Sequence, residues 1–340
     1  MCAPRAPIRR ATESPHVESD EQISNDGGTP FTLREFVAEA EGRLRMEVVV
    51  GGEGLGHEVL EPMCNRPGLA LTGFYGYFAW RRIQVIGQAE LAYLESLAHD
   101  MRMERVKALF DRGAYCLIFA CGMEVPQEIA QLAEQAGAVV CRTELLTRVF
   151  FHQAAFVLEK LRAPKVKLYG TTVEVAGLGV MLEGAPGLGK SETALGLVKH
   201  GNALVADDLT CLRKDVAANM LFASASPATR NYMEIRGIGI IHVPSVFGVT
   251  AVRAEKRLDL VVTLKGMKES EGELDRTGEE RQTRTILGVE VPQITIPVSA
   301  GRDLVNLVET AAQQYKLLAA GHDAVKALDA QLCARAEGKF

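Results

Sequence analysis

Short apolar runs alternate with segments of helical period along the first half of the chain. The runs RMEVVVGG, RIQVIG and YCLIFACG have the length of buried strands. Between the last two runs, residues 88–113 carry apolar side chains at helical spacing, and this segment ends in a glycine. Short apolar strands that alternate with helices are typical of α/β proteins. The pattern therefore predicts an α/β domain with a largely parallel sheet.

Helix boundaries divide the chain into two domains. Thr32 and Glu35 form a capping-box pattern at the start of TLREFVAEAEG, which predicts a helix there. A second helical segment, ELLTRVFFHQAAFVLEKLR, ends close to a proline. We therefore predict an N-terminal α/β domain over residues 30–158 and a second domain over residues 159–330. Residues 1–29 are rich in Pro, Ser, Thr and acidic residues and poor in large apolar ones, which predicts a disordered tail.

The second domain begins with strands and ends with helices. The stretch TTVEVAGLGVMLEG predicts a β-hairpin with its turn near Leu178-Gly179. A helix is expected over residues 190–200, followed by strands in NALVADD, LDLVVTL and QITIPVS. The C-terminal segment has helical character with a break at Gly321.

A phosphate-loop pattern, GAPGLGKS, lies where a strand of this domain gives way to a helix. Such a turn directs backbone N–H groups and the helix N-terminus at phosphate oxygens. Lys190 would pair with the β- and γ-phosphates of ATP, and the hydroxyl of Ser191 would bind Mg²⁺. Pro186 lacks an N–H group, but the other amides of the loop remain. The predicted nucleotide-binding residues are Gly184, Ala185, Pro186, Gly187, Leu188, Gly189, Lys190 and Ser191.

Two aspartates, Asp207 and Asp208, follow the apolar strand in LVADD, 17 and 18 residues after Lys190. Two carboxylates at the end of a strand suit a partner for a metal ion and a general base. The alternative is a strand-end turn with solvated carboxylates. The phosphate loop upstream favours the catalytic interpretation.

Composition limits the classes of partner. A net charge of −5 and the lack of a long basic block argue against a nucleic-acid surface. The seven cysteines form no C-x-x-C pair and no zinc spacing with histidines, so we expect reduced thiols without chemistry. No apolar run reaches the length of a secretory signal near the N-terminus, or the roughly 18 residues of a membrane span elsewhere. We therefore expect a cytoplasmic protein that binds neither nucleic acid nor membrane.

The segment YMEIRGIGIIHVPSVFG (232–248) resembles the signature segment of the HPr kinase/phosphorylase family. Members of this family are bacterial bifunctional serine kinases that regulate sugar transport. Four further segments are similar to the family: NRPGLALTGFYGYFAWRRIQVIGQAELAYLE, GKSETALGLVKHGNALVADD, LDRTGEERQT and VEVPQITIPVSAGRDLVNLVETAA. Together they extend over nearly all of residues 30–325. The resemblance therefore covers both predicted domains.

The resemblance implies a P-loop catalytic domain similar to that of phosphoenolpyruvate carboxykinase, in homohexamers of two-domain subunits. Members of the family use ATP and Mg²⁺ to phosphorylate a serine of the carrier protein HPr. They also remove that phosphate with inorganic phosphate and release pyrophosphate.

Site residues are carried over from the family pattern by position. Asp208 matches the aspartate that takes the serine proton, and Asp207 matches its neighbour. Ser191 and Glu234 match magnesium ligands. Lys190 matches the phosphate-loop lysine, and Arg276 matches a catalytic arginine. The segment that the family uses in phosphorolysis corresponds to Pro297, Val298, Ser299, Ala300, Gly301 and Arg302.

Tyr169 departs from the family pattern, because it stands where the family has a catalytic histidine. A tyrosine hydroxyl can orient a phosphate or an aspartate, but it does not readily become a cation that faces inorganic phosphate. Ala185, Pro186 and Ser299 also replace more polar or basic residues. We therefore expect kinase activity to be retained better than phosphorolysis. Two alternatives stay open: a nucleotide-binding scaffold without turnover, and a kinase for a different acceptor on the same fold.

Overall fold

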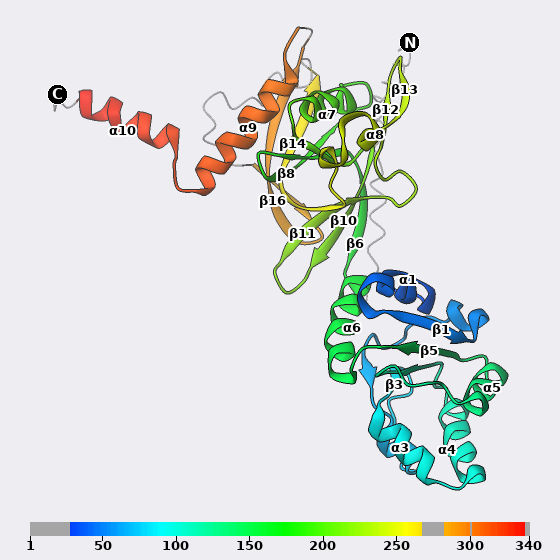
Figure 1. Cartoon of the computed structure of the whole chain (residues 1–340). Helices are drawn as coiled ribbons and strands as arrows, with labels where there is room; N and C mark the ends of the chain where they lie inside the picture. Colours follow the sequence, from blue (N-terminus) through cyan, green and yellow to red (C-terminus); the bar gives the residue numbers. More distant parts are fainter. Residues whose placement is uncertain (1–27, 267–281, 300, 337–340) are drawn as a thin grey trace, which may run out of the picture.

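Two separate sheets organise the chain in the computed structural model, which describes residues 28–266, 282–299 and 301–336 (Figure 1). The first sheet has the order β1-β5-β4-β3-β2. Strands β2 to β5 run parallel, and β1 runs antiparallel to β5. The strands are β1 (Met46–Val50), β2 (Cys64–Asn65), β3 (Ile83–Ile86), β4 (Cys116–Phe119) and β5 (Val139–Thr143). The predicted α/β fold class with a largely parallel sheet is confirmed here.

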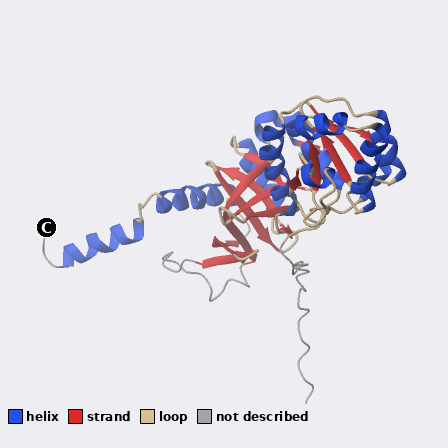
Figure 2. Cartoon of the chain, turned by 90° about the horizontal axis from the view of Figure 1, so that it is seen from below, coloured by secondary structure: helices blue, strands red, loops and turns tan. Residues whose placement is uncertain are grey.

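Helices cover both faces of this sheet, as Figure 2 shows. Because successive strand residues point to opposite faces, β3, β4 and β5 supply apolar side chains to two cores. One core lies under α1 (Leu33–Leu44) and α6 (Thr147–Arg162). The other lies under α2 (Gly68–Leu71), α3 (Gln88–Ser96), α4 (His99–Asp111) and α5 (Gln127–Gln135). A short 3-10 helix, η1 (Gly52–Gly56), follows β1.

The helix boundaries of the N-terminal domain confirm most of the predicted signals. Thr32 and Glu35 form the reciprocal capping box at the start of α1. The segment predicted as one helical stretch over residues 88–113 instead forms two helices, α3 and α4, because the chain becomes extended at Leu97. The Ser96 hydroxyl donates to the Tyr93 carbonyl at 2.7 Å and competes with the helical pattern. The hydrophobic period continues across this break and does not reveal it.

The second sheet has nine strands in the order β6-β10-β11-β14-β8-β7-β9, with β16 paired to both β14 and β15. Three of them, β8, β14 and β16, run parallel to one another. Helices α7 and α9 pack against one face, and a second core fills the other. The strands are β6 (Lys165–Tyr169), β7 (Thr171–Val175), β8 (Leu178–Gly184), β9 (Ala203–Ala206), β10 (Leu209–Asp215), β11 (Met220–Ala225), β14 (Glu255–Gly266), β15 (Gln282–Ile286) and β16 (Val289–Val298).

The remaining elements lie around this sheet. A separate hairpin, β12 (Tyr232–Ile235) and β13 (Gly239–His242), leads into α8 (Val243–Phe247) and η2 (Val249–Ala251). Helix α7 (Lys190–Lys199) follows the phosphate loop. The C-terminus forms α9 (Leu304–Ala319) and α10 (Ala324–Ala336), which are separated at Gly321 as predicted, and α10 projects away from the sheet in Figure 1.

The turn between β7 and β8 lies two residues earlier than predicted. Ala176 and Gly177 occupy it, and both have positive φ angles, 51° and 87°. This is the geometry of the two-residue hairpin turn that follows strand twist. Gly179 has another purpose, because a Cβ there would come within 1.9 Å of the Arg257 carbonyl oxygen. The glycine allows β8 to approach β14 closely.

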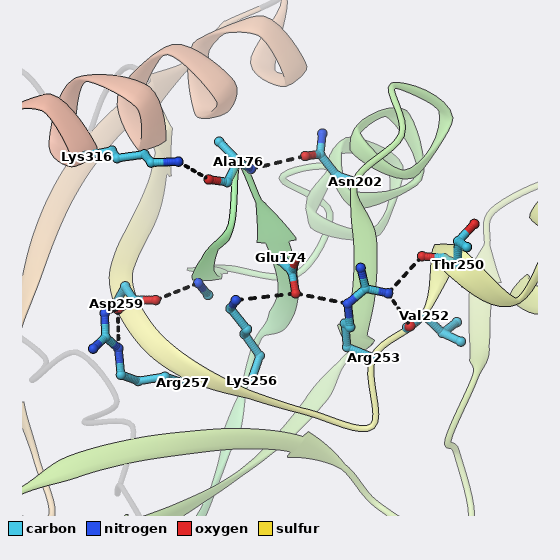
Figure 3. Close-up of polar contacts among 11 residues, drawn as sticks. Glu174, Ala176, Asn202, Thr250, Val252, Arg253, Lys256, Arg257, Asp259 and Lys316 are labelled. Carbon is cyan, nitrogen blue, oxygen red and sulfur yellow. Dashed lines mark hydrogen bonds and ion pairs between the residues drawn. The ribbon is translucent and has the colours of Figure 1, made fainter. Parts of the chain in front are cut away.

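Ion pairs and hydrogen bonds of charged side chains connect β7, β8 and β14 at the end of the sheet where β8 and β14 begin (Figure 3). The carboxylate of Asp259 accepts from the backbone N–H of Gly179 at 2.9 Å and from Arg257. Glu174 pairs with Arg253 at 3.1 Å and with Lys256 at 3.4 Å. These contacts hold β7, β8 and β14 together at the edge opposite the phosphate loop, so their role is structural.

Most of the predicted N-terminal tail, residues 1–27, lies outside the described residues. Within the described part, the backbone N–H of Thr29 donates to the Arg162 carbonyl at 2.8 Å. Within residues 28–266, 282–299 and 301–336, no helix has the length and apolarity required to cross a membrane.

Candidate active site

The carboxyl ends of three parallel strands meet at one edge of the second sheet. Gly184 at the end of β8 lies opposite Leu264 of β14, and Gly266 lies opposite Val298 of β16. The phosphate loop leaves this edge from β8, and the predicted phosphorolysis segment leaves it from β16. Carboxyl edges of parallel strands are the usual ligand sites of α/β folds.

The phosphate loop has the strand–loop–helix geometry that the motif requires. Gly184, Gly187 and Gly189 all have positive φ angles, and Gly189 directly precedes the first residue of α7. A Cβ at Gly184 would lie 2.4 Å from the Leu264 carbonyl oxygen, so only glycine fits there. The ammonium group of Lys190 bends back and donates to the carbonyls of Gly184 at 2.8 Å and Ala185 at 3.3 Å. The lysine charge thus lies over the loop.

Asp207 is buried and firmly held beside the loop. One carboxylate oxygen, Oδ1, accepts from the hydroxyls of Ser191 and Thr171, each at 2.9 Å. The other oxygen, Oδ2, accepts from the backbone N–H of Glu234 at 3.2 Å. Only 8% of the residue is exposed. The contact to Ser191 joins the end of β9 to the start of α7.

Asp208 has a different environment, because its side chain is exposed. The φ angle of Asp208 is 61°. Its two neighbours are joined by a hydrogen bond, because the backbone N–H of Leu209 donates to the Asp207 carbonyl at 2.7 Å. This three-residue turn with positive φ is rare and strained for a residue other than glycine. The turn directs one aspartate into the protein and presents the other to solvent, which is the division of roles expected for a metal partner and a base.

Tyr169 and Glu234 lie next to this pair. Tyr169 ends β6 opposite Leu209 of β10, and 79% of it is exposed. Glu234 reaches Asp207 through its backbone, while its side chain is exposed. The structure therefore brings both residues to the aspartates, although no bond joins the Tyr169 hydroxyl to either of them in the described residues.

The oxygen atoms of Ser191 and Asp207 fit a magnesium ion. Mg²⁺ prefers oxygen ligands and is commonly bound by one or two protein groups together with substrate phosphates and water. In the described part of the chain, no three His, Cys, Asp or Glu side chains cluster as a metal site. A magnesium ion here would therefore take most of its ligands from the nucleotide and from water.

The segment after β16 lies close to the phosphate loop. The Arg302 guanidinium donates to the Pro297 carbonyl at 3.1 Å, and its backbone N–H donates to the Ser299 carbonyl at 3.2 Å. Leu304, at the start of α9, comes within 3.9 Å of the position that a Cβ on Gly189 would occupy. Arg276 and Ala300, two of the predicted site residues, lie outside the described residues.

Two buried polar residues near the loop escaped the sequence analysis. Thr171 bonds to Asp207 as described above. Glu183, directly before the loop, accepts from Thr263 at 2.7 Å and pairs with Arg284. Gln293 also donates to it, at 3.3 Å. The available signal for Glu183 was a carboxylate inside the apolar run VMLEG; Thr171 had none, because threonine is common in strands.

Comparisons with known proteins cover both parts of the chain. Residues 31–158 match the family model described as HPr Serine kinase N terminus, and residues 160–332 match HPr Serine kinase C-terminal domain. The chain belongs to the HPr serine kinase family. This confirms the predicted resemblance, and the chain is accordingly an enzyme of the serine kinase class.

Two relatives that are similar in sequence agree with the family assignment. The chain is 39% identical to an HPr kinase/phosphorylase of Leptospira biflexa serovar Patoc over 284 residues, which are 83% of this chain and 88% of the relative. It is 40% identical to an HPr kinase/phosphorylase of an Exiguobacterium species over 275 residues, or 81% and 88% of the two chains. The solved structure of the Hpr(Ser) kinase/phosphatase from Coxiella burnetii is 31% identical, with a TM-score of 0.44, and the match covers 48% of this chain and 98% of that one.

Proposed function

We propose that this HPr serine kinase family member transfers the γ-phosphoryl group of ATP to a serine of HPr or of an HPr-like carrier protein. The observation that carries the proposal is the contact between Ser191 of the phosphate loop and Asp207, beside the exposed Asp208. A pure nucleotide-binding scaffold has no need of an exposed carboxylate held in a strained turn next to its phosphate loop. The carboxylate therefore favours catalysis over binding alone.

Each residue of the site has a role in this reaction. The backbone amides of the loop and the ammonium of Lys190 would hold the phosphates. Ser191 and Asp207, with Glu234 beside them, would hold Mg²⁺, which when bound offsets charge on the phosphates. Asp208 would accept the proton of the attacking serine hydroxyl.

Arg276 belongs to the same proposal through the family pattern, as the group that offsets charge on the transferred phosphoryl group. Homohexameric assembly also rests on that pattern, and we infer in addition that the protein acts in the cytoplasm. In the reverse direction, Arg302 would help to hold inorganic phosphate, which attacks phosphoserine to give serine and pyrophosphate. Tyr169 replaces a group that can become cationic, and Ser299 replaces a basic one. We therefore infer that phosphorolysis is weak.

The test measures transfer of label from γ-labelled ATP to a serine of purified HPr with Mg²⁺, and the same assay on Asp208→Asn. Loss of a general base lowers the rate by about 10²–10⁴-fold. Asp215→Asn is the matched control, because Asp215 ends the same strand, β10, that begins after Asp208. We expect it to retain wild-type activity.

The second arm adds millimolar phosphate to labelled HPr and compares the wild type with Tyr169→His. We expect slow removal by the wild type and faster removal by the histidine variant. Removal by the wild type as fast as labelling contradicts the proposed weakness of phosphorolysis. Bound ATP without any label on HPr favours the scaffold or another acceptor protein.

A further inference from the structure

Thr171 is a buried side chain with polar contacts to both aspartates of the site. It is the first residue of β7, and it is fully buried. Its hydroxyl donates to Oδ1 of Asp207 at 2.9 Å. The Thr171 hydroxyl oxygen also accepts from the backbone N–H of Asp208 at 3.5 Å. A hydroxyl has a single proton, so these two contacts use its donor and one acceptor site.

The contact to Asp208 falls where the backbone most needs support. With a φ angle of 61°, Asp208 lies in a conformation that persists only when its surroundings hold it. Thr171 accepts from its N–H, and Gly170 donates to its carbonyl at 2.8 Å. The backbone of Asp208 is thus held on both sides by two consecutive residues, at the junction of β6 and β7.

The contact to Asp207 complements that of Ser191. Both hydroxyls donate to the same carboxylate oxygen. If Ser191 turns toward a magnesium ion, as its proposed role requires, Asp207 loses one of these donors. Thr171 would then keep the buried carboxylate bonded and oriented during the reaction.

We propose that Thr171 is a positioning residue for phosphoryl transfer, which acts by fixing the orientation of Asp207 and the turn at Asp208. This inference rests on the proposed kinase function. Thr171 itself is fully buried, which keeps its side chain away from nucleotide and acceptor in solution. Its effect should therefore appear in kcat rather than in the KM for ATP.

The test compares Thr171→Val, which keeps the shape and removes the hydroxyl, with Thr171→Ser, which restores the hydroxyl. A misplaced catalytic group lowers the rate by about 10²-fold, so Thr171→Val should lower kcat by about that factor and leave the KM for ATP nearly unchanged. Thr171→Ser should recover most of this loss. Thr172→Val is the matched control, because Thr172 is equally buried in β7 but its hydroxyl bonds to that of Thr210 at 2.9 Å and not to Asp207 or Asp208.

Two kinetic outcomes overturn the inference: wild-type kcat in Thr171→Val, or an equal loss in Thr172→Val. Hydrogen exchange at the Asp208 amide provides a readout that needs no acceptor protein, and Thr171→Val should accelerate it while Thr172→Val should not. If wild-type protein fails to label HPr, the proposed function fails. In that case the hydrogen-exchange rate of the Asp208 amide decides the role of Thr171. A rate in Thr171→Val equal to that of the wild type overturns this role, and a faster rate supports the conclusion that Thr171 stabilises the turn.

Discussion

At the scale of single residues, burial controls the ionisation of two cysteine thiols. Cys116 and Cys141 lie in the core beneath α1 and α6, and burial raises the pKa of both thiols, in the case of Cys141 to about 12. The thiolate is the reactive form of cysteine, so these thiols stay neutral and inert near pH 7. The sequence predicted reduced thiols without chemistry, and the burial of these two agrees with that expectation. Cys333, by contrast, is exposed.

Stability of the N-terminal domain should fall above pH 9 because of these thiols. Folding favours the neutral thiol of Cys141, whereas the same thiol in the unfolded chain ionises near pH 9.0. The stabilising effect is therefore complete below pH 9 and is lost as the pH rises toward 12. Between pH 8 and pH 10 the loss is about 1 kcal/mol for Cys141.

Urea unfolding under reducing conditions, followed by the fluorescence of Trp80, measures this loss, because Trp80 is the single tryptophan of the chain. Cys141→Ala should lose less stability between the two pH values than the wild type. Cys333→Ala, which removes an exposed thiol, is the control. An equal pH dependence in Cys141→Ala and wild type would disprove the assigned cause.

At the scale of elements, strand β8 connects the sheet to the phosphate loop. Glu183 is the last residue before the loop, and only 8% of it is exposed. Thr263 from β14, Arg284 from β15 and Gln293 from β16 all contact it. Three neighbouring strands are thus joined to the residue that precedes Gly184, which fixes the edge from which the loop departs.

Glu183→Ala should destabilise the C-terminal domain, since it removes the carboxylate that accepts from Thr263, Arg284 and Gln293. Removing one partner of a buried pair costs about 3–5 kcal/mol, but the Arg284 side chain is 35% exposed and can reach water. We therefore expect a loss of about 1–2 kcal/mol. Calorimetry measures it, and Glu290→Ala, an exposed carboxylate of β16, is the control. Equal melting temperatures for Glu183→Ala and wild type would show that the cluster contributes nothing.

At the scale of the whole molecule, the two sheets have separate cores. The residues that pack under α1 to α6 come from the N-terminal part alone, and those around α7 and α9 come from the C-terminal part alone. The chain passes from one to the other where α6 leads into β6. Cores that share no residues allow each domain to unfold on its own.

Mg²⁺ with ATP should therefore stabilise only the C-terminal domain. A ligand at about 100 times its Kd stabilises the state that binds it by about 2.7 kcal/mol. The calorimetric transition of this domain should shift upward, while the transition reported by Trp80 in the N-terminal domain should stay unchanged. Lys190→Ala should abolish the shift. If both transitions move together, the domains unfold as one unit.

Local sequence signals determined much of this protein. The capping box of α1, the apolar strands and the GAPGLGKS loop are patterns of short range, since helix period, strand length and loop geometry depend on neighbouring residues. Family membership also followed from contiguous motifs, and the aspartate pair was recognised by its distance from the loop. These features required no knowledge of how the strands pair.

Tertiary structure alone decided how the site is assembled. The bond between Thr171 and Asp207 joins residues 36 positions apart, and the pairing of Glu183 with Arg284 spans 101 positions. Whether such groups meet depends on strand order and register, which no local pattern encodes.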